Sequence, residues 1–304
     1  MIAAKDISDS DSLEEWLTEW PKSQGMSEAE ARQVAVQIAH RAAMRVLPIA
    51  WEWYQSKAAR EYGGSSVAGL AAALYPDLAF SCDVLQYSQS RYGSRPMIEA
   101  RRIGDCAKNY NWHNTTQIVQ AAISSRAAAY ASWSQDYPAA VQDALDAIAS
   151  SLLVSHKTNE LWSEISSDLT KLTQSGFSNH LGKLWNDHPN EFDFKAKEIL
   201  SSLPVNSFWR SWYEAKLQGE HFPNGVVDEL LKLTEEHWSL PDDQLNHLLD
   251  VVWVKHALAQ DIERIKGSLL SNQGNWLSVI QRCHNGPPEL VEDEIQVAKS
   301  VTIV

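Results

Sequence analysis

NSFWRSWYEAKLQG, residues 206–219, places four aromatic side chains within six positions. At about 100° per residue, its apolar positions form one continuous arc and its polar positions fill the other half of a helix. The arc comprises Phe208, Trp209, Trp212, Tyr213 and Leu217. A ligand cage would need aromatic side chains that converge from several elements. The periodicity therefore predicts a helix whose aromatic face packs into a hydrophobic core.

The residues that flank this arc support the same prediction. Asn206 or Ser207 can cap the start of a helix, and Gly219 suits the position just past its end. Arg210 and Glu214 have the i, i+4 spacing of an ion pair on the polar face.

Helical periodicity extends along most of the chain, and strict strand alternation is almost absent. The segments with this pattern are 13–20, 27–48, 67–74, 97–110, 115–137, 139–154, 158–172, 194–203, 226–237 and 242–270. We expect Pro21 and Pro48 to end the first two. A looser stretch, 176–191, contains a hint of a short helix around Leu184. The fold class is therefore all-α, an irregular multi-helix bundle of roughly ten to thirteen helices that could form two helical subdomains.

Segment 27–48 has an apolar stripe along one helix face. Its members are Val34, Ile38, Ala42 and Val46. His40, Arg41 and Arg45 lie off that stripe.

The composition changes near residue 155. Alanine is frequent over 121–150, whereas tryptophan, present thirteen times in the chain, is frequent afterwards. We expect a helical domain at 1–155 with an acidic start and a basic middle. A Trp-rich helical domain at 156–284 and an acidic tail at 285–304 would follow.

Charge is unevenly distributed in this acidic chain. A net charge of −13 argues against non-specific nucleic-acid binding but leaves room for a local anion site. The basic cluster consists of Arg91, Arg95, Arg101, Arg102 and Lys108. Guanidinium groups suit phosphate or carboxylate, so a small anionic ligand such as a nucleotide could bind there. Pairing of these residues with acidic segments of the same chain is the alternative, and no glycine-rich phosphate loop accompanies them.

Histidines and acids gather in the last third of the chain. They are Glu236, His237, His247, Asp250 and His256. Neither an HExxH motif nor paired Cys and His ligands are present, so we expect surface histidines, no metal and no cofactor.

No motif identifies a catalytic residue. Cys283 and His284 are adjacent, and neighbours in a regular element point apart. A GxSxG nucleophile motif is missing as well. An active site assembled from residues far apart in the sequence remains an alternative.

The location is expected to be the cytoplasm. Three widely spaced cysteines without a CxxC motif fit a reducing compartment. The acidic N-terminus is unlike a signal peptide, and no apolar run is long enough to span a bilayer. We therefore expect no membrane partner.

Three segments resemble uncharacterised bacterial Trp-rich all-helical proteins of no assigned activity. They are DISDSDSLEEWL (6–17), QVAVQIAHRAAMRVLPIAWEW (33–53) and FWRSWYEAKLQG (208–219). The resemblance implies a bacterial source and a helical fold, and it transfers no functional residue.

The pattern as a whole favours a helical protein-interaction module. Such a protein would be an adaptor, regulator or sensor in a bacterial stress or defence pathway, with another protein as its partner. A binder of a small anionic ligand through residues 91–108, and an enzyme without a recognisable motif, are the alternatives.

Overall fold

The structure, a computed structural model, describes most of the first 271 residues. The described residues are 2–54, 70, 73–74, 76, 116–134, 136–154, 158–175, 181–186, 191–204, 207–220, 224–238 and 240–271. Contacts divide the chain into two units, Met1–Val254 and Lys255–Val304. All the elements described below lie in the first unit, except for the second half of the last helix.

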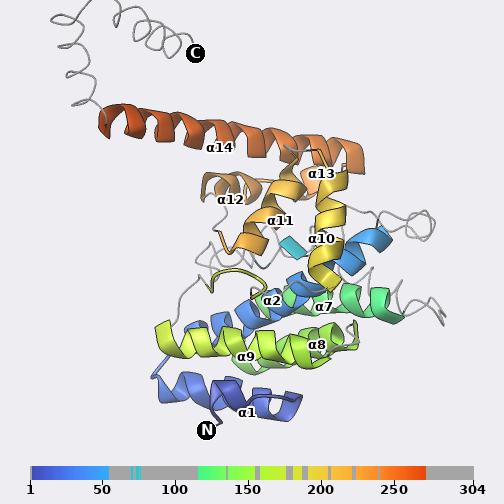
Figure 1. Cartoon of the computed structure of the whole chain (residues 1–304), viewed down its shortest axis with the longest axis vertical. Helices are drawn as coiled ribbons and strands as arrows, with labels where there is room; N and C mark the ends of the chain where they lie inside the picture. Colours follow the sequence, from blue (N-terminus) through green and yellow to red (C-terminus); the bar gives the residue numbers. More distant parts are fainter. Residues whose placement is uncertain are drawn as a thin grey trace, which may run out of the picture. The chain divides into compact units, whose positions relative to one another are not determined.

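The described residues form ten α-helices and one short 3-10 helix and contain no strand, which confirms the all-α class. Figure 1 labels the α-helices. In chain order the elements are η1 (Ala4–Asp6), α1 (Ser10–Ser23), α2 (Glu28–Tyr54), α7 (Thr116–Trp133), α8 (Tyr137–Val154), α9 (Thr158–Ser175), α10 (Glu191–Ser202), α11 (Phe208–Gln218), α12 (Asn224–Leu230), α13 (Glu235–Trp238) and α14 (Asp242–Ser271).

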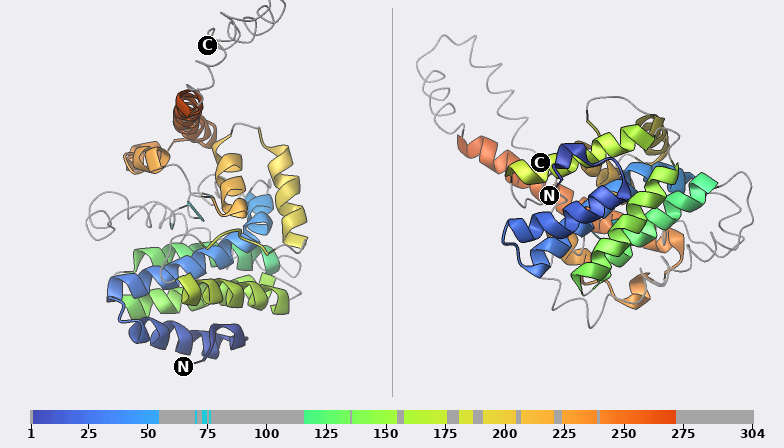
Figure 2. Two further views of the ribbon diagram at one scale, coloured as in Figure 1. Left: turned by 60° about the vertical axis from the view of Figure 1, so that its left-hand side comes forward. Right: turned by 90° about the horizontal axis from the view of Figure 1, so that it is seen from below.

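Helices α2, α7 and α8 pack against one another and form the centre of the first unit. Helix α1 lies against α2 and α8, and α9 contacts both of them as well. Helices α10 and α11 run across the direction of these helices, as two views show (Figures 1 and 2). This arrangement brings α11 next to the second half of α2.

Helix α2 is buried around its whole circumference. Most of its side chains from Val34 to Trp51 are almost fully inaccessible to solvent. His40, Arg41 and Arg45, which lie off the predicted apolar stripe, are 5%, 9% and 0% exposed. A central helix covered on all sides leaves no solvent face for polar residues, so these groups need partners inside the protein.

The expectation that Pro21 and Pro48 end their helices is wrong. Helix α1 continues to Ser23 and α2 continues to Tyr54. A proline inside a helix costs about 3 kcal/mol. Burial of Trp51, which is 1% exposed, offsets that cost at Pro48 by packing the last turns of α2 into the core.

Two other segments also differ from the predicted helices. Residues 226–237 form two short helices, α12 and α13, where one helix was expected. The short helix suggested around Leu184 is a loop over residues 181–186. Gly182 adopts φ +70° in this loop, a left-handed conformation that no α-helix accommodates.

The aromatic face of α11 packs into the core, as predicted. Phe208 and Trp212 are fully buried, and Trp209 and Tyr213 are at most 5% exposed. The Tyr213 hydroxyl donates to the carbonyl oxygen of Met44 on α2 at 3.1 Å. Helix α11 therefore anchors the second half of α2.

The two ends of α11 are fixed by different parts of the chain. Gly219 takes φ +71° just past the helix, as predicted. Ser207 occupies the capping position, but its side chain makes no capping hydrogen bond. The Phe208 amide instead donates to Oδ1 of Asp250 on α14 at 2.7 Å, so a tertiary contact takes the place of a Ser207 side-chain cap. Asn206, the alternative cap, lies outside the described residues.

One hydrophobic cluster joins buried side chains from Ala4 to Val252, on both sides of the domain boundary expected near residue 155. That boundary stays a prediction, which can be tested by asking whether each half of the chain folds alone. None of the helices in the described part combines the length and apolarity needed to cross a membrane.

Candidate functional site

The predicted basic cluster lies outside the described residues. Its members are Arg91, Arg95, Arg101, Arg102 and Lys108. All three cysteines, Cys82, Cys106 and Cys283, lie outside them too. Anion binding by residues 91–108 therefore stays a prediction.

A buried ion cluster joins α2 to α9. Arg41 Nε lies 2.9 Å from Oδ2 of Asp168, and Arg45 Nη2 lies 2.7 Å from the same oxygen. Glu164, one helical turn before Asp168, approaches Arg45 Nη2 at 3.7 Å. Asp168 and Arg45 are 1% and 0% exposed, so the groups interact without water screening.

The same two arginines fix the 181–186 loop. Arg41 donates to the carbonyl oxygens of Gly182 at 3.0 Å and Lys183 at 2.6 Å. Arg45 Nε donates to the carbonyl of Leu184 at 3.0 Å. The guanidinium donors thus satisfy backbone groups that a loop cannot pair by itself.

Opposite charges determine the titration of this cluster. Burial favours the protonated form of Asp168, but Arg41 and Arg45 outweigh it and hold the pKa of Asp168 below its usual value. Burial lowers the pKa of Arg45, against the attraction of Asp168. The two arginines and the two carboxylates have opposite charges, and the cluster joins α2, α9 and the 181–186 loop. Oδ1 of Asp168 and Nη1 of Arg45 are buried without a hydrogen-bond partner among the described residues.

The sequence contained one signal of this cluster. Arg41 and Arg45 are like charges at i, i+4 within a largely apolar stretch of α2, a pair that repels unless a carboxylate bridges it. The partner, Asp168, lies 127 residues from Arg41 and could not be chosen from the sequence.

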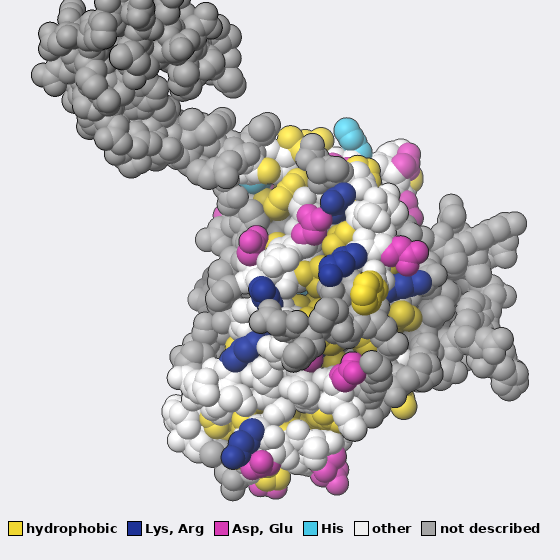
Figure 3. Space-filling view, in the orientation of Figure 1, with side chains coloured by type: hydrophobic (Ala, Val, Ile, Leu, Met, Phe, Trp, Pro, Cys, Tyr) yellow, Lys and Arg dark blue, Asp and Glu magenta, His cyan; other side chains and the backbone are white. Residues whose placement is uncertain are grey.

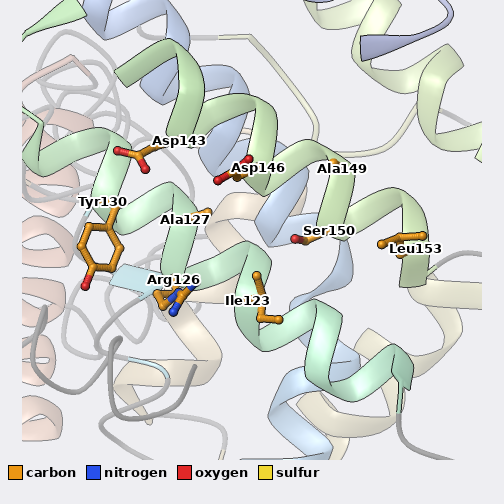
Figure 4. A pocket seen from close by; sticks show the side chains of 9 residues that line it. All are labelled: Ile123, Arg126, Ala127, Tyr130, Asp143, Asp146, Ala149, Ser150 and Leu153. Atoms are coloured by element: carbon orange, nitrogen blue, oxygen red, sulfur yellow. The ribbon is translucent and has the colours of Figure 1, made fainter. Parts of the chain in front are cut away.

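A shallow groove of about 170 Å³ lies between α7 and α8 (Figure 4). It is lined by Ile123, Arg126, Ala127, Tyr130, Asp143, Asp146, Ala149, Ser150 and Leu153. Helix α7 contributes the first four residues and α8 the remaining five. None of these residues belongs to a sequence pattern that indicates a site.

Charged side chains of both signs line this groove. The Arg126 guanidinium carbon lies 5.9 Å from the centre of the Tyr130 ring, within reach of a cation–π interaction. Asp143 accepts a hydrogen bond from the Ser134 hydroxyl at 2.7 Å. Burial nevertheless raises the pKa of Asp143 above its usual value. Asp146, on the same face of α8, is exposed.

The first half of α14 is apolar on two faces. Leu245, Leu249 and Val252 are buried against the core. Val251 and Val254 are 51% and 39% exposed, which is high for valine on a helix packed against a core. In Figure 3, hydrophobic side chains are visible at the top of the first unit, where Figure 1 places the first half of α14.

The histidines of the last third do not assemble a site. His237 Nδ1 accepts a hydrogen bond from the Thr234 amide at 3.1 Å, and Asp250 is engaged as the cap of α11. Within the described ranges, no group of three or more His, Cys, Asp or Glu side chains is arranged to hold a metal ion.

Comparison with protein-family models, curated proteins and solved structures finds no match for this chain. The resemblance of 6–17, 33–53 and 208–219 to uncharacterised bacterial helical proteins stays a prediction.

Proposed function

We propose that the protein is a helical protein-interaction module that binds its partner through α14. In the cell it acts as an adaptor, regulator or sensor in a bacterial stress or defence pathway. The exposed apolar face of α14, with Val251 and Val254, carries this proposal. Such a face on an otherwise packed helix is typical of a binding surface.

The two faces of α14 have different tasks. Leu245, Leu249 and Val252 already attach the helix to the core. The valines on the other face are only partly covered, and the exposure of their remaining apolar surface is unfavourable in water. A partner that covers them removes this unfavourable exposure.

The sequence of α14 indicates the chemistry of the partner. From Val251 to Leu269, steps of four and three residues alternate, as in the a and d positions of a heptad repeat. The positions are Val251, Lys255, Leu258, Ile262, Ile265 and Leu269. Helices with this repeat pair with another helix that has a matching apolar stripe. The occupant is therefore an amphipathic helix of another protein.

Two substitutions on the exposed face test the proposal. Val251→Asp with Val254→Asp places charges where the partner helix would bury valines, and both positions are exposed enough to leave folding intact. Affinity purification of the tagged chain from its native cell should recover a partner with the wild type and lose it with the double variant.

Phe194→Asp on α10 is the matched control, because Phe194 is 68% exposed and apolar but lies on another helix. This variant should retain the partner. Equal recovery by the double variant would contradict the proposal. Light scattering that gives a dimer mass would also contradict it, because a second copy of the chain would then occupy the face.

A further inference from the structure

The groove between α7 and α8 has one sign of charge on each wall. Arg126 lies on the α7 wall, and Asp143 and Asp146 lie on the α8 wall opposite it (Figure 4). Arg126 lowers the pKa of Asp143 through space. Within the described part of the chain, however, no direct ion pair joins Arg126 to either aspartate. Opposite charges thus face each other across an open space.

Arg126 has a donor without a hydrogen-bond partner. Its Nε atom is buried and has no hydrogen-bond partner among the described residues. The Tyr130 ring covers one face of the guanidinium but accepts none of its in-plane hydrogen bonds. A guanidinium with unused in-plane donors is suited to a carboxylate, which it binds through two parallel hydrogen bonds.

Ser150 provides a second polar group inside the groove. The residue is only 7% exposed, yet it lines the groove, and its oxygen points into the space between the two helices (Figure 4). A serine hydroxyl can both donate and accept a hydrogen bond, so this group can contact a polar ligand in the groove.

The other end of the groove is apolar. Ile123 and Leu153 line it, and Leu153 is 64% exposed. The small side chains of Ala127 and Ala149 keep the middle of the groove open. An apolar substituent of a ligand would lie on Leu153 and remove it from water.

We propose that this groove binds a zwitterionic α-amino acid with an apolar side chain. The ligand carboxylate accepts hydrogen bonds from Arg126, and the ligand ammonium donates to Asp146 and to the Ser150 hydroxyl. The apolar side chain lies toward Leu153. A volume of about 170 Å³ is below the range of about 300–1,000 Å³ found for drug-sized ligands and suits a molecule this small. The proposal is independent of the interaction surface on α14.

Titration calorimetry of the full chain with three matched compounds tests this proposal. L-Leucine carries both charges, isopentylamine lacks the carboxylate and 4-methylpentanoate lacks the ammonium. We expect L-leucine to bind with a Kd on the order of 1 mM and each single-charge compound at least about tenfold more weakly. Equal binding of the three compounds, or no heat from L-leucine at about 20 mM, would overturn the proposal.

Substitutions in the groove connect binding to its residues. Arg126→Gln and Asp146→Asn should each weaken L-leucine binding by about tenfold or more, since each removes one charge-assisted contact. Asp228→Asn, an exposed acid on α12, is the control and should leave the Kd unchanged. Unchanged binding in both groove variants would place the amino acid elsewhere and overturn the proposal.

Discussion

Gly219 shows how one residue joins distant parts of the fold. It takes φ +71°, and a Cβ atom there would overlap the backbone of Gly182 in the 181–186 loop. Gly25 has a similar φ of +66° with open space around it. The two glycines therefore separate the effect of backbone conformation from the effect of packing.

Gly219→Ala is predicted to destabilise the protein by roughly 3 kcal/mol or more, because backbone strain and overlap act together. Gly25→Ala should cost only about 1–2 kcal/mol, the strain of the left-handed conformation alone. Denaturant unfolding of both variants measures the difference. Equal losses would contradict the close approach of Gly219 to Gly182.

The burial of Tyr137 predicts that the folded protein loses stability at alkaline pH. Its hydroxyl donates to the carbonyl oxygen of Leu17 on α1, and burial, assisted by Glu19, raises the pKa of Tyr137 to about 12. The folded state therefore favours the neutral phenol. This contribution to stability is complete below the unfolded pKa of about 10 and disappears as the pH rises toward about 12.

Unfolding of the wild type and of Tyr137→Phe across this pH range tests the assignment. The wild type should lose stability more steeply than the variant between about pH 10 and pH 12. Parallel curves would show that Tyr137 does not titrate as described.

At the scale of elements, α11 was largely predictable because its pattern is local. The aromatic arc, the Arg210–Glu214 pair at 2.9 Å and the position of Gly219 all follow from spacing within twelve residues of sequence. Its cap was not predictable, since Asp250 lies 42 residues from Phe208. Local sequence rules offered Asn206 or Ser207 as the cap, whereas the tertiary structure supplies the carboxylate of Asp250.

Asp250→Ala is predicted to cost about 1 kcal/mol, the usual effect of losing a helix cap. Ser207→Ala should cost less, because the Ser207 hydroxyl makes no capping hydrogen bond. Thermal unfolding of the two variants measures both effects. A larger loss of stability for Ser207→Ala than for Asp250→Ala would indicate that Ser207 caps the helix and would contradict the cap by Asp250.

At the scale of the molecule, the fold class was predictable because helical periodicity repeats along the chain. The ion cluster was only partly visible, as like charges on an apolar helix without an identified carboxylate. The groove gave no sequence signal, because Arg126 and the two aspartates of its α8 wall belong to different helices. Both sites depend on contacts between residues far apart in the sequence, and helical periodicity contains no information about such contacts.

Asp168→Asn is predicted to destabilise the protein by about 3–5 kcal/mol, because two buried guanidinium groups lose their counter-charge. Glu214→Gln removes an exposed ion pair with Arg210 and should cost less than about 1 kcal/mol. Urea unfolding at neutral pH compares the two variants. Similar small losses of unfolding free energy in the two variants would contradict a stabilising role of the buried ion cluster.

The same cluster predicts acid sensitivity. The pKa of Asp168 is lower in the folded state than its ordinary 3.8, so its contribution is complete above that pH and is lost as the pH falls below it. The wild type should lose stability in this range, whereas Asp168→Asn should show a shallower dependence. Identical acid profiles would contradict the assignment.

The central claim is that the protein binds a partner's helix through the exposed apolar face of α14. Photo-crosslinking tests this claim most directly, with a photoreactive amino acid at position 251 on α14 or, as the control, at position 194 on α10. We expect a defined crosslinked partner from position 251 and none from position 194. Crosslinks from position 251 that stay within the chain, or the same partner from both positions, would contradict the claim.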